Sequence, residues 1–227
     1  MTIFLDSGDI GEIKRFMKMG IIRGVTTNPT ILMKDGFKGG MKELKERQIE
    51  IAGIIEPYPL SVEVTTNDRE EMLAQAREFS DWAENINVKI TVHGPEGELD
   101  NLEIIHLLET EHDIRVNVTA MMSAQQGLLA ALAGATYVSL FGGRINNMGY
   151  NAVEEISTLR NLLEDQGLNA KIIVGSTREI LNVVEWLEAG AHIVTVTPTL
   201  LEGMIVHPYT KETVRMFLED AGKTSKQ

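Results

Sequence analysis

The stretch that decides the fold is Asn87-Val88-Lys89-Ile90-Thr91-Val92, a run rich in β-branched residues at positions 87–92. A pattern with the 3.6-residue period of a helix follows at 99–111, and a second β-type run follows at 114–118. Together these segments predict one strand–helix–strand unit, in which the two strands run parallel and the helix covers one face of the sheet.

The same alternation extends in both directions to the ends of the chain. The strand candidates are residues 2–5, 24–27, 60–65, 87–92, 114–118, 136–140, 171–175 and 192–197. The helical candidates are residues 10–19, 40–55, 68–84, 99–111, 123–133, 149–166, 177–189, 200–206 and 211–221. Eight strands alternating with helices predict a single-domain α/β protein with the (β/α)8 TIM-barrel fold, over residues 1–221. Residues 222–227 are predicted to be a mobile tail.

An open, doubly wound sheet is the alternative architecture. It is less well supported, because the first strand is followed by Asp6-Ser7-Gly8-Asp9 and not by the glycine-rich G-x-G-x-x-G turn of dinucleotide-binding folds.

Composition excludes several classes of function. The 227 residues carry a formal charge of −12, which argues against a general nucleic-acid binder. There are no cysteines, so disulfides and thiolate sites are excluded, and the five scattered histidines indicate no metal site. We see no signal peptide and no run of eighteen apolar residues, and therefore expect a soluble cytoplasmic protein without a membrane span. Nothing in the sequence indicates a cofactor.

Lys89 is unusual because it lies inside a strand that is expected to be buried. A buried, unpaired charge costs several kcal/mol (about 3–5), so the amine must be paired, reach solvent or lose its proton. A lysine on an edge strand that extends its ammonium group to solvent is one interpretation. A desolvated amine that attacks a carbonyl and forms a Schiff base is the other.

Polar side chains at the other strand ends favour the second interpretation, since active sites of such barrels lie at the carboxyl ends of the strands. Glu63 lies in the strand next to Lys89, and neighbouring strands are about 4.8 Å apart. Asp6 ends the first strand and supplies a second carboxylate for acid–base chemistry. Two structural alternatives stay open: a buried ion pair that fixes strand register, and a helix cap at Asp6.

Arg144, Ser176 and Arg178 follow later strands and predict a site for an oxyanion. Guanidinium groups donate two parallel hydrogen bonds to phosphate or sulfonate oxygens. A surface salt bridge is the alternative role for either arginine.

The chain resembles the small transaldolase/fructose-6-phosphate aldolase family over essentially its whole length. The resemblance rests on Phe4-Leu5-Asp6, on Gly24-Val25-Thr26-Thr27-Asn28-Pro29-Thr30, on Val62-Glu63-Val64, on Val88-Lys89-Ile90, on Asn117-Val118-Thr119, on Ala133-Gly134-Ala135-Thr136-Tyr137-Val138-Ser139, on Phe141 with Gly143-Arg144, on Ser176-Thr177-Arg178 and on His207-Pro208. The second of these motifs is highly specific.

The resemblance implies a role for each matching residue. Lys89 would form the Schiff base with a ketose and retain dihydroxyacetone as an enamine, and Asp6 would act as acid and base at the C4 hydroxyl. Glu63 and Thr119 would hold the water that relays protons at the imine. Thr26, Asn28 and Ser139 would bind hydroxyls of the dihydroxyacetone part, and Arg144, Ser176 and Arg178 would hold the distal anion. Asn117 and Phe141 are also implied to bind substrate.

Two positions bear on the type of reaction. Family members that act as fructose-6-phosphate aldolases carry Gln and Tyr where this chain has Glu63 and Phe141. Without a phenol that helps to position a water molecule, the enamine is protonated slowly and waits for an aldehyde. The resemblance therefore implies transfer of dihydroxyacetone to an acceptor, a transaldolase reaction.

Departures from the family pattern bear on the substrate. Asn146-Asn147 replaces two aspartates, Gly175 precedes the Ser-x-Arg motif in place of alanine, and Thr91-Val92-His93-Gly94 follows the lysine strand in place of a proline-containing stretch. These changes suggest the sulfofructose transaldolase branch: a 6-deoxy-6-sulfofructose donor that gives sulfolactaldehyde, and glyceraldehyde 3-phosphate or erythrose 4-phosphate as acceptor.

Three alternatives stay open. They are an ordinary pentose-phosphate transaldolase acting on sedoheptulose 7-phosphate or fructose 6-phosphate, a fructose-6-phosphate aldolase, and a non-catalytic barrel that only binds a ligand. The family resemblance also implies a homo-oligomer, as a ring of five subunits or a decamer.

Overall fold

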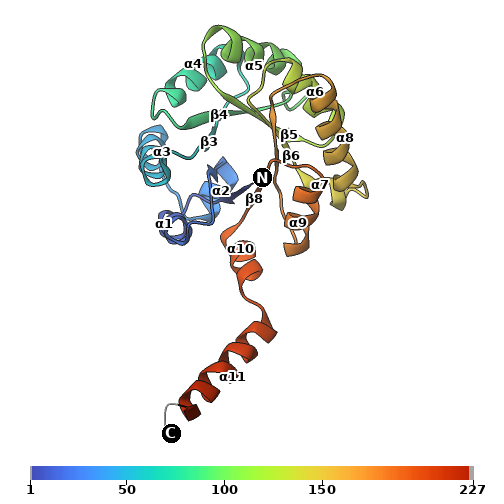
Figure 1. Cartoon of the computed structure of the whole chain (residues 1–227). Coiled ribbons are helices and arrows are strands. Elements are labelled where there is room, and N and C mark those ends of the chain that lie inside the picture. Colours follow the sequence, from blue (N-terminus) through green and yellow to red (C-terminus); the bar gives the residue numbers. More distant parts are fainter. Residues whose placement is uncertain (1, 225–227) are drawn as a thin grey trace.

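Eight parallel strands form a closed barrel in the computed structural model, which describes residues 2–224. The strands pair in chain order, and the last pairs with the first (Figure 1). They are β1 (Thr2–Asp6), β2 (Val25–Thr26), β3 (Leu60–Glu63), β4 (Ile86–Thr91), β5 (Val116–Met121), β6 (Tyr137–Leu140), β7 (Lys171–Val174) and β8 (Ile193–Val196). The predicted (β/α)8 TIM barrel is confirmed, and the open sheet is excluded.

Helices follow the strands, and most of them lie around the barrel (Figure 1). They are α1 (Ile10–Met19), α2 (Pro29–Lys34), α3 (Met41–Ile55), α4 (Arg69–Ser80), α5 (Asp100–Glu111), α6 (Ala124–Leu132), α7 (Gly142–Asn147), α8 (Ala152–Asp165), α9 (Ile180–Glu188), α10 (Pro198–Ile205) and α11 (Pro208–Thr224). All nine predicted helices are present, with ends shifted by a few residues. Two six-residue helices, α2 and α7, were not predicted, because six residues are too few to establish a helical period.

N-terminal caps define where several of the helices begin. Asp9 caps α1 by accepting a hydrogen bond from the Glu12 amide, so the helix-cap alternative for Asp6 is wrong. Asp68 and Ser123 cap α4 and α6 in the same way, as their sequence positions predict.

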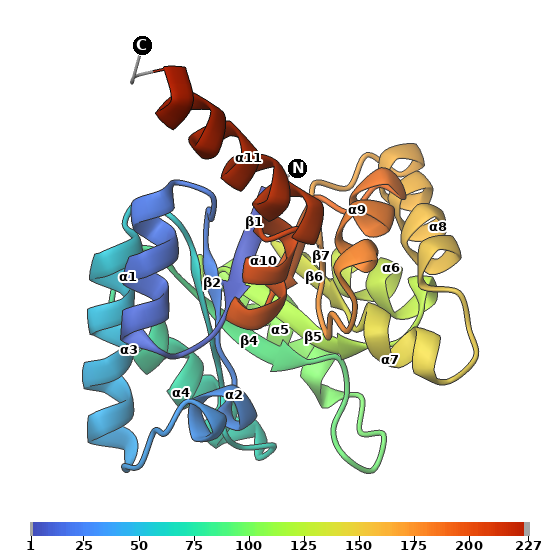
Figure 2. The same ribbon diagram turned by 90° about the horizontal axis from the view of Figure 1, so that it is seen from below.

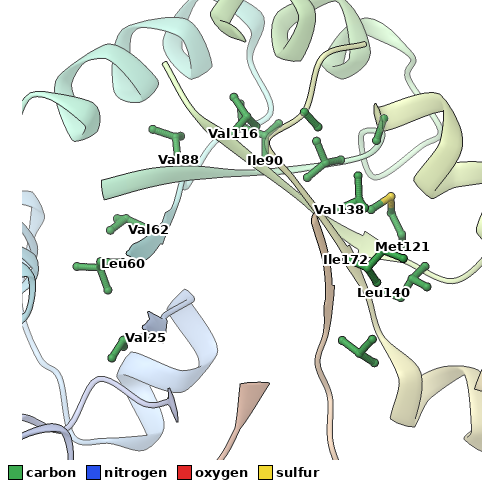
Figure 3. Close-up of a cluster of buried hydrophobic side chains, with 14 of the residues drawn as sticks. Val25, Leu60, Val62, Val88, Ile90, Val116, Met121, Val138, Leu140 and Ile172 are labelled. Carbon is green, nitrogen blue, oxygen red and sulfur yellow. The ribbon is translucent and has the colours of Figure 1, made fainter. Parts of the chain in front are cut away.

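The main hydrophobic core lies between the strands and the surrounding helices (Figure 3). It is built from helix residues such as Phe16 and from the alternate strand residues that point outward. Examples of the latter are Val62 in β3 and Val88 and Ile90 in β4, which are at most 1% exposed. Because side chains alternate along a strand, the residues between them point into the barrel. Lys89 lies between Val88 and Ile90, and Glu63 follows Val62, so both point inward.

The barrel interior has an apolar floor and a polar upper layer. Phe4, Tyr137, Ile173 and Ile193 form the apolar cluster that closes the floor. Buried polar side chains also line the interior: Ser61, Asn87 and Asn117 lie near the amino ends of their strands, and Thr26, Lys89, Thr119, Ser139 and Thr195 lie nearer the carboxyl ends. The fold therefore concentrates polar chemistry at one end of the barrel.

The C-terminal helix α11 extends away from the barrel in both views (Figures 1 and 2). The predicted tail at residues 222–227 begins inside this helix, which continues to Thr224, and residues 225–227 lie outside the described residues. The division into a barrel and a mobile tail stays a prediction. Between residues 2 and 224, no helix is long and apolar enough to cross a membrane.

Candidate active site

Lys89 and Glu63 form an ion pair inside the barrel. The two residues are directly opposite each other in the register of β3 and β4. Lys89 Nζ lies 3.1 Å from Glu63 Oε2 and donates a second hydrogen bond of 3.2 Å to the carbonyl oxygen of Thr27. Lys89 is only 5% exposed, so the interpretation of a lysine extending to solvent is wrong. The amine is held beside a group that can accept its proton.

Asp6 is the second carboxylate of the site. Its Oδ1 accepts a 2.6 Å hydrogen bond from the Thr26 hydroxyl, which also lies 2.6 Å from the Thr195 hydroxyl. Burial raises the pKa of Asp6 above its usual value, and the Thr26 hydrogen bond and the Lys89 charge oppose that rise. Asp6 Oδ2 has no hydrogen bond among the described residues and is left for a substrate group.

A hydrogen-bonded row of side chains crosses the barrel beside Lys89. Ser139 donates to Asn117 Oδ1 at 2.6 Å, and Asn117 Nδ2 donates to the Ser61 hydroxyl at 3.0 Å. These contacts fix the Asn117 amide in one orientation, because each of its ends has a defined partner.

Thr119 contributes a hydroxyl that is buried but unpaired. Its Oγ1 has no hydrogen-bond partner within residues 2–224, although the residue is 1% exposed. The strand register shifts between Val118 and Met121, and Ala120 has a positive φ of 62°. Such irregularities re-aim side chains near active sites, and an orphaned hydroxyl beside the amine is suited to hold a substrate group or water.

A cavity of about 400 Å³ opens at this end of the barrel; we call it the inner cavity. It is bordered by eleven of the twelve residues predicted to form the site: Asp6, Thr26, Asn28, Glu63, Lys89, Asn117, Thr119, Ser139, Phe141, Arg144 and Ser176. One of them, Asn28, also caps α2, since its Oδ1 accepts a 2.9 Å hydrogen bond from the Ile31 amide. Its Nδ2 stays available to the cavity.

Arg178 is the exception among the predicted residues. It borders a neighbouring cavity of about 470 Å³, the outer cavity, which shares Asp6, Ile31, Lys34, Ser176 and Thr195 with the inner one. The three predicted anion-binding residues are therefore divided: Arg144 lies on the inner cavity, Arg178 on the outer and Ser176 on both.

Arg144 packs over the Phe141 ring, with its guanidinium carbon 5.3 Å from the ring centroid. Neither Arg144 nor Arg178 forms an ion pair with a carboxylate in the described part of the chain. The salt-bridge alternative for the two arginines therefore receives no support, and both charges are available to an anionic ligand.

Ser176 has a strained backbone at the boundary of the two cavities. Its φ is 59°, and its buried Oγ has no partner within residues 2–224. A Cβ added to Gly143 would come within 1.8 Å of the Ser176 carbonyl oxygen and 2.8 Å of Arg178 Cγ. The absence of a side chain at Gly143 lets the two loops that carry the arginines touch.

Among the residues of these cavities that were not predicted, Thr195 and Lys34 are polar and border both cavities. Thr195 is an inward residue of β8, two positions after Ile193, and the alternation of side chains along the strand could have identified it. Lys34 ends α2 and borders both cavities, but an unpredicted six-residue helix gives no sequence signal that would direct it there.

Asn146 and Asn147 were expected to alter the anion site, but neither residue contacts it directly. Neither residue borders the two cavities, and Asn146 Oδ1 instead accepts a hydrogen bond from the Ala152 amide at the start of α8. Any influence on Arg144 is limited to the absence of acidic charges near it.

The fold and the site define a class: a (β/α)8-barrel enzyme with an amine and two carboxylates on one cavity. The model of the transaldolase/fructose-6-phosphate aldolase family matches residues 3–227. "Probable transaldolase 2" of Listeria monocytogenes is 40% identical over 220 residues, which cover 97% of this chain and 95% of the relative. "Probable transaldolase" of Carboxydothermus hydrogenoformans is also 40% identical, with 97% of each chain covered.

The chain therefore belongs to the transaldolase/fructose-6-phosphate aldolase family and is an enzyme of the transaldolase type. Solved structures agree on the fold alone. Thiamine phosphate pyrophosphorylase from Pyrococcus furiosus is similar with a TM-score of 0.60 at 10% identity, covering 86% of this chain and 85% of that one. Lactate oxidase from Pediococcus acidilactici has a TM-score of 0.56 at 14% identity, covering 89% and 64% of the two chains.

Proposed function

We propose that the protein transfers dihydroxyacetone from a ketose to an aldehyde through a Schiff base on Lys89. The observation that carries the proposal is the arrangement of one buried amine and two carboxylates on one cavity. Lys89 lies 3.1 Å from Glu63, and Asp6 borders the same cavity with one oxygen free. A purely structural ion pair would not need the second carboxylate or the unpaired Thr119 hydroxyl.

The first half of the reaction breaks a carbon–carbon bond. Lys89 gives a proton to Glu63 and attacks the C2 carbonyl of the ketose, and loss of water from the carbinolamine leaves an iminium ion. Asp6 takes the proton of the C4 hydroxyl, the C3–C4 bond breaks, and its electron pair moves into the iminium ion to form an enamine. The aldehyde fragment leaves.

The second half reverses these steps with a different aldehyde. The enamine attacks the acceptor carbonyl, and protonated Asp6 returns its proton to the new hydroxyl. Water then attacks the iminium ion and releases the product ketose from Lys89. Glu63 and Thr119 are the proposed partners of that water, because one carries a carboxylate beside the amine and the other an unpaired buried hydroxyl.

Dependence on an acceptor distinguishes transfer from the aldolase reaction. We expect turnover of the donor to require an aldehyde such as glyceraldehyde 3-phosphate, with little free dihydroxyacetone formed in its absence. Phe141 and Glu63 support transfer, because neither side chain is a phenol that would help to protonate the enamine. Rapid release of dihydroxyacetone without an acceptor would favour the aldolase alternative.

We further propose 6-deoxy-6-sulfofructose as the donor, with sulfolactaldehyde as the product. A sulfonate carries one negative charge and a phosphate nearly two at neutral pH. The support is the departure from the family pattern in the sequence around Arg144 and Ser176. An ordinary sugar phosphate donor is the second candidate, and the comparisons with curated transaldolases are compatible with it.

A comparison of the two donors tests this choice. With glyceraldehyde 3-phosphate as the acceptor, we expect kcat/KM for 6-deoxy-6-sulfofructose to exceed that for fructose 6-phosphate. A preference for fructose 6-phosphate would assign the protein to ordinary sugar phosphate metabolism and leave the role of Lys89 intact. Location in the cytoplasm stays a prediction from the sequence.

We also propose that the protein works as a homo-oligomer, a pentameric ring or a decamer. The exposed apolar residues of α11 support association, and the size of the assembly rests on family resemblance alone.

A further inference from the structure

Two buried hydroxyl groups connect β8 to Asp6, the proposed proton-transfer residue. Thr195 Oγ1 lies 2.6 Å from Thr26 Oγ1, and Thr26 Oγ1 lies 2.6 Å from Asp6 Oδ1. Thr195 is 6% exposed and Thr26 is 3% exposed, so water does not compete freely for either hydroxyl. The three residues come from β8, β2 and β1, which are neighbours in the closed barrel.

The direction of these hydrogen bonds follows from the number of hydrogens. A threonine hydroxyl has one hydrogen to donate and two lone pairs to accept. Thr26 uses its hydrogen in the bond to the Asp6 carboxylate, so it can only accept from Thr195. Thr195 must therefore donate to Thr26, and the bonds run in one direction from Thr195 to Asp6.

We infer that Thr195 is a positioning residue of the reaction: its hydroxyl fixes the orientation of the Thr26 hydroxyl and thereby the hydrogen bond that Asp6 receives. This inference rests on the proposed function of Asp6. Each bond in such a chain polarises the next, so the Thr26 donor is stronger when Thr195 donates to it. Without Thr195, the Thr26 hydrogen could rotate away from Asp6 toward the cavity.

The polypeptide holds Thr195 in place independently of Asp6. The backbone carbonyl of Thr195 accepts a 2.8 Å hydrogen bond from the Thr177 hydroxyl. Phe4 of β1 is the register partner of Thr195. Its methyl group lies 3.2 Å from the position that a Cβ on Gly175 would occupy. The backbone of Thr195 is therefore fixed by β1 and by Thr177, and this places its hydroxyl beside that of Thr26.

The consequence for pH dependence has a definite sign. A hydrogen bond donated to a carboxylate favours the ionised form, so the chain opposes the rise in the pKa of Asp6 that burial causes. Weakening the chain raises that pKa, and the acidic limb of the cleavage rate moves to higher pH. The other charged groups on the two cavities that Asp6 borders are Asp9, Glu12, Arg15, Lys34, Asp35, Glu63, Lys89, Arg144, Arg178 and Glu202. The substitutions below leave all of them in place.

The test compares pH profiles of kcat for donor cleavage in Thr195→Val, Thr195→Ser and the wild type. Thr195→Val keeps the shape of the side chain and removes the hydroxyl. We expect its acidic limb to move up by about half a pH unit to one unit and kcat at neutral pH to fall about tenfold, with KM changed less than twofold. Thr195→Ser keeps the hydroxyl, and its limb should stay within a few tenths of a unit of the wild type.

Thr158→Val is the matched control, since Thr158 is exposed on α8 and borders neither cavity. It should leave the profile unchanged. If Thr195→Val does not fold, Thr195→Ala replaces it as the variant without a hydroxyl. An unchanged profile for the hydroxyl-free variant, or equal shifts in Thr195→Val and Thr195→Ser, would overturn the inference.

Borohydride trapping separates this inference from the proposed function. Wild type and Thr195→Val should both form a donor adduct at Lys89 if the Schiff-base proposal is right, whatever the pH profiles are. No adduct in the active wild type would contradict the proposed function itself.

Discussion

At the scale of single residues, the site contains two carboxylates whose surroundings differ. Glu63 is paired with the Lys89 amine, whereas Asp6 is held by a hydroxyl and keeps one oxygen free toward the cavity. Burial raises the pKa of Asp6, which suits a group that must both take and return a proton. The proposed division of labour follows: Glu63 serves the imine and Asp6 serves the C4 hydroxyl.

Asp6→Asn should separate bond cleavage from Schiff-base formation. An amide cannot take the C4 hydroxyl proton, so we expect kcat to fall by about 10²–10⁴-fold, while borohydride still traps the donor on Lys89. Asp9→Asn is the matched control, because asparagine caps a helix as well as aspartate does. Equal losses in the two variants would contradict a specific role for Asp6.

The sequence allowed Lys89 and Glu63 to be predicted as neighbours, because adjacent strands and matching strand ends determine their distance. The third partner of the pair could not be predicted in this way. Lys89 bonds to the backbone carbonyl of Thr27, and any residue type supplies a carbonyl. Thr195 was also missed, because only the residues at the strand ends were considered. Thr195 points into the barrel from a position before the end of β8.

At the scale of elements, the positions of the strands were predicted well and the short helices that follow them were not. Asn28-Pro29 carries a cap residue followed by proline, a recognised start of a helix, yet α2 has only six residues. For α7, Gly142-Gly143 concealed the helix, because glycine disfavours helices. Gly143 of α7 serves a contact with the loop after β7 that a local pattern does not reveal.

Gly143→Ala tests the contact between the loops after β6 and β7. The added Cβ would overlap the Ser176 carbonyl, so one loop must move. We expect a loss of about 1–3 kcal/mol in the free energy of unfolding and a rise in KM for anionic donors. Gly53→Ala is the control: nothing lies within 4 Å of the new methyl group, and alanine favours the helix. A stable Gly143→Ala variant with unchanged KM would contradict the account of this contact.

His192, just before β8, links stability to pH. Its Nδ1 accepts a 3.0 Å hydrogen bond from the Ile172 amide, and burial together with Arg160 lowers the pKa of His192 to about 4. In the unfolded chain the pKa is near 6.5, so below that pH the unfolded state binds a proton that the folded state does not. His192 therefore costs stability as the pH falls from about 6.5 to about 4.

Urea unfolding of the wild type and His192→Gln between pH 7.5 and pH 4 measures this cost. Acidification should destabilise the wild type more than His192→Gln. The difference between their free energies of unfolding should change by about 1–2 kcal/mol, a value that takes the partial exposure of the ring into account. His106→Gln, on the exposed side of α5, should follow the wild type. A difference between wild type and His192→Gln that does not vary with pH would refute the linkage.

At the scale of the whole molecule, α11 stands apart from the barrel (Figure 1). Its large apolar side chains are 48–73% exposed: Tyr209, Val214, Met216, Phe217 and Leu218. An exposed apolar face of this kind marks an interaction surface more often than a free one. The sequence predicted the helix from its period, but a period does not reveal what a helix packs against.

Phe217→Asp combined with Leu218→Asp tests whether α11 holds an oligomer together. We expect multi-angle light scattering to give an oligomer for the wild type and a smaller species for the double variant, because two charges oppose burial of the helix face. Lys211→Asp, on the same helix, changes charge without removing apolar area and should keep the wild-type mass. A monomeric wild type would contradict the proposed assembly.

Mass spectrometry of the protein after borohydride reduction with a ketose donor tests the central claim most directly. We predict that a reduced three-carbon unit is added to Lys89 when the leaving aldehyde is removed, and that Lys89→Arg, which keeps the charge, shows no adduct and no turnover. An active preparation that gives no adduct, or an adduct on another lysine, would contradict the account.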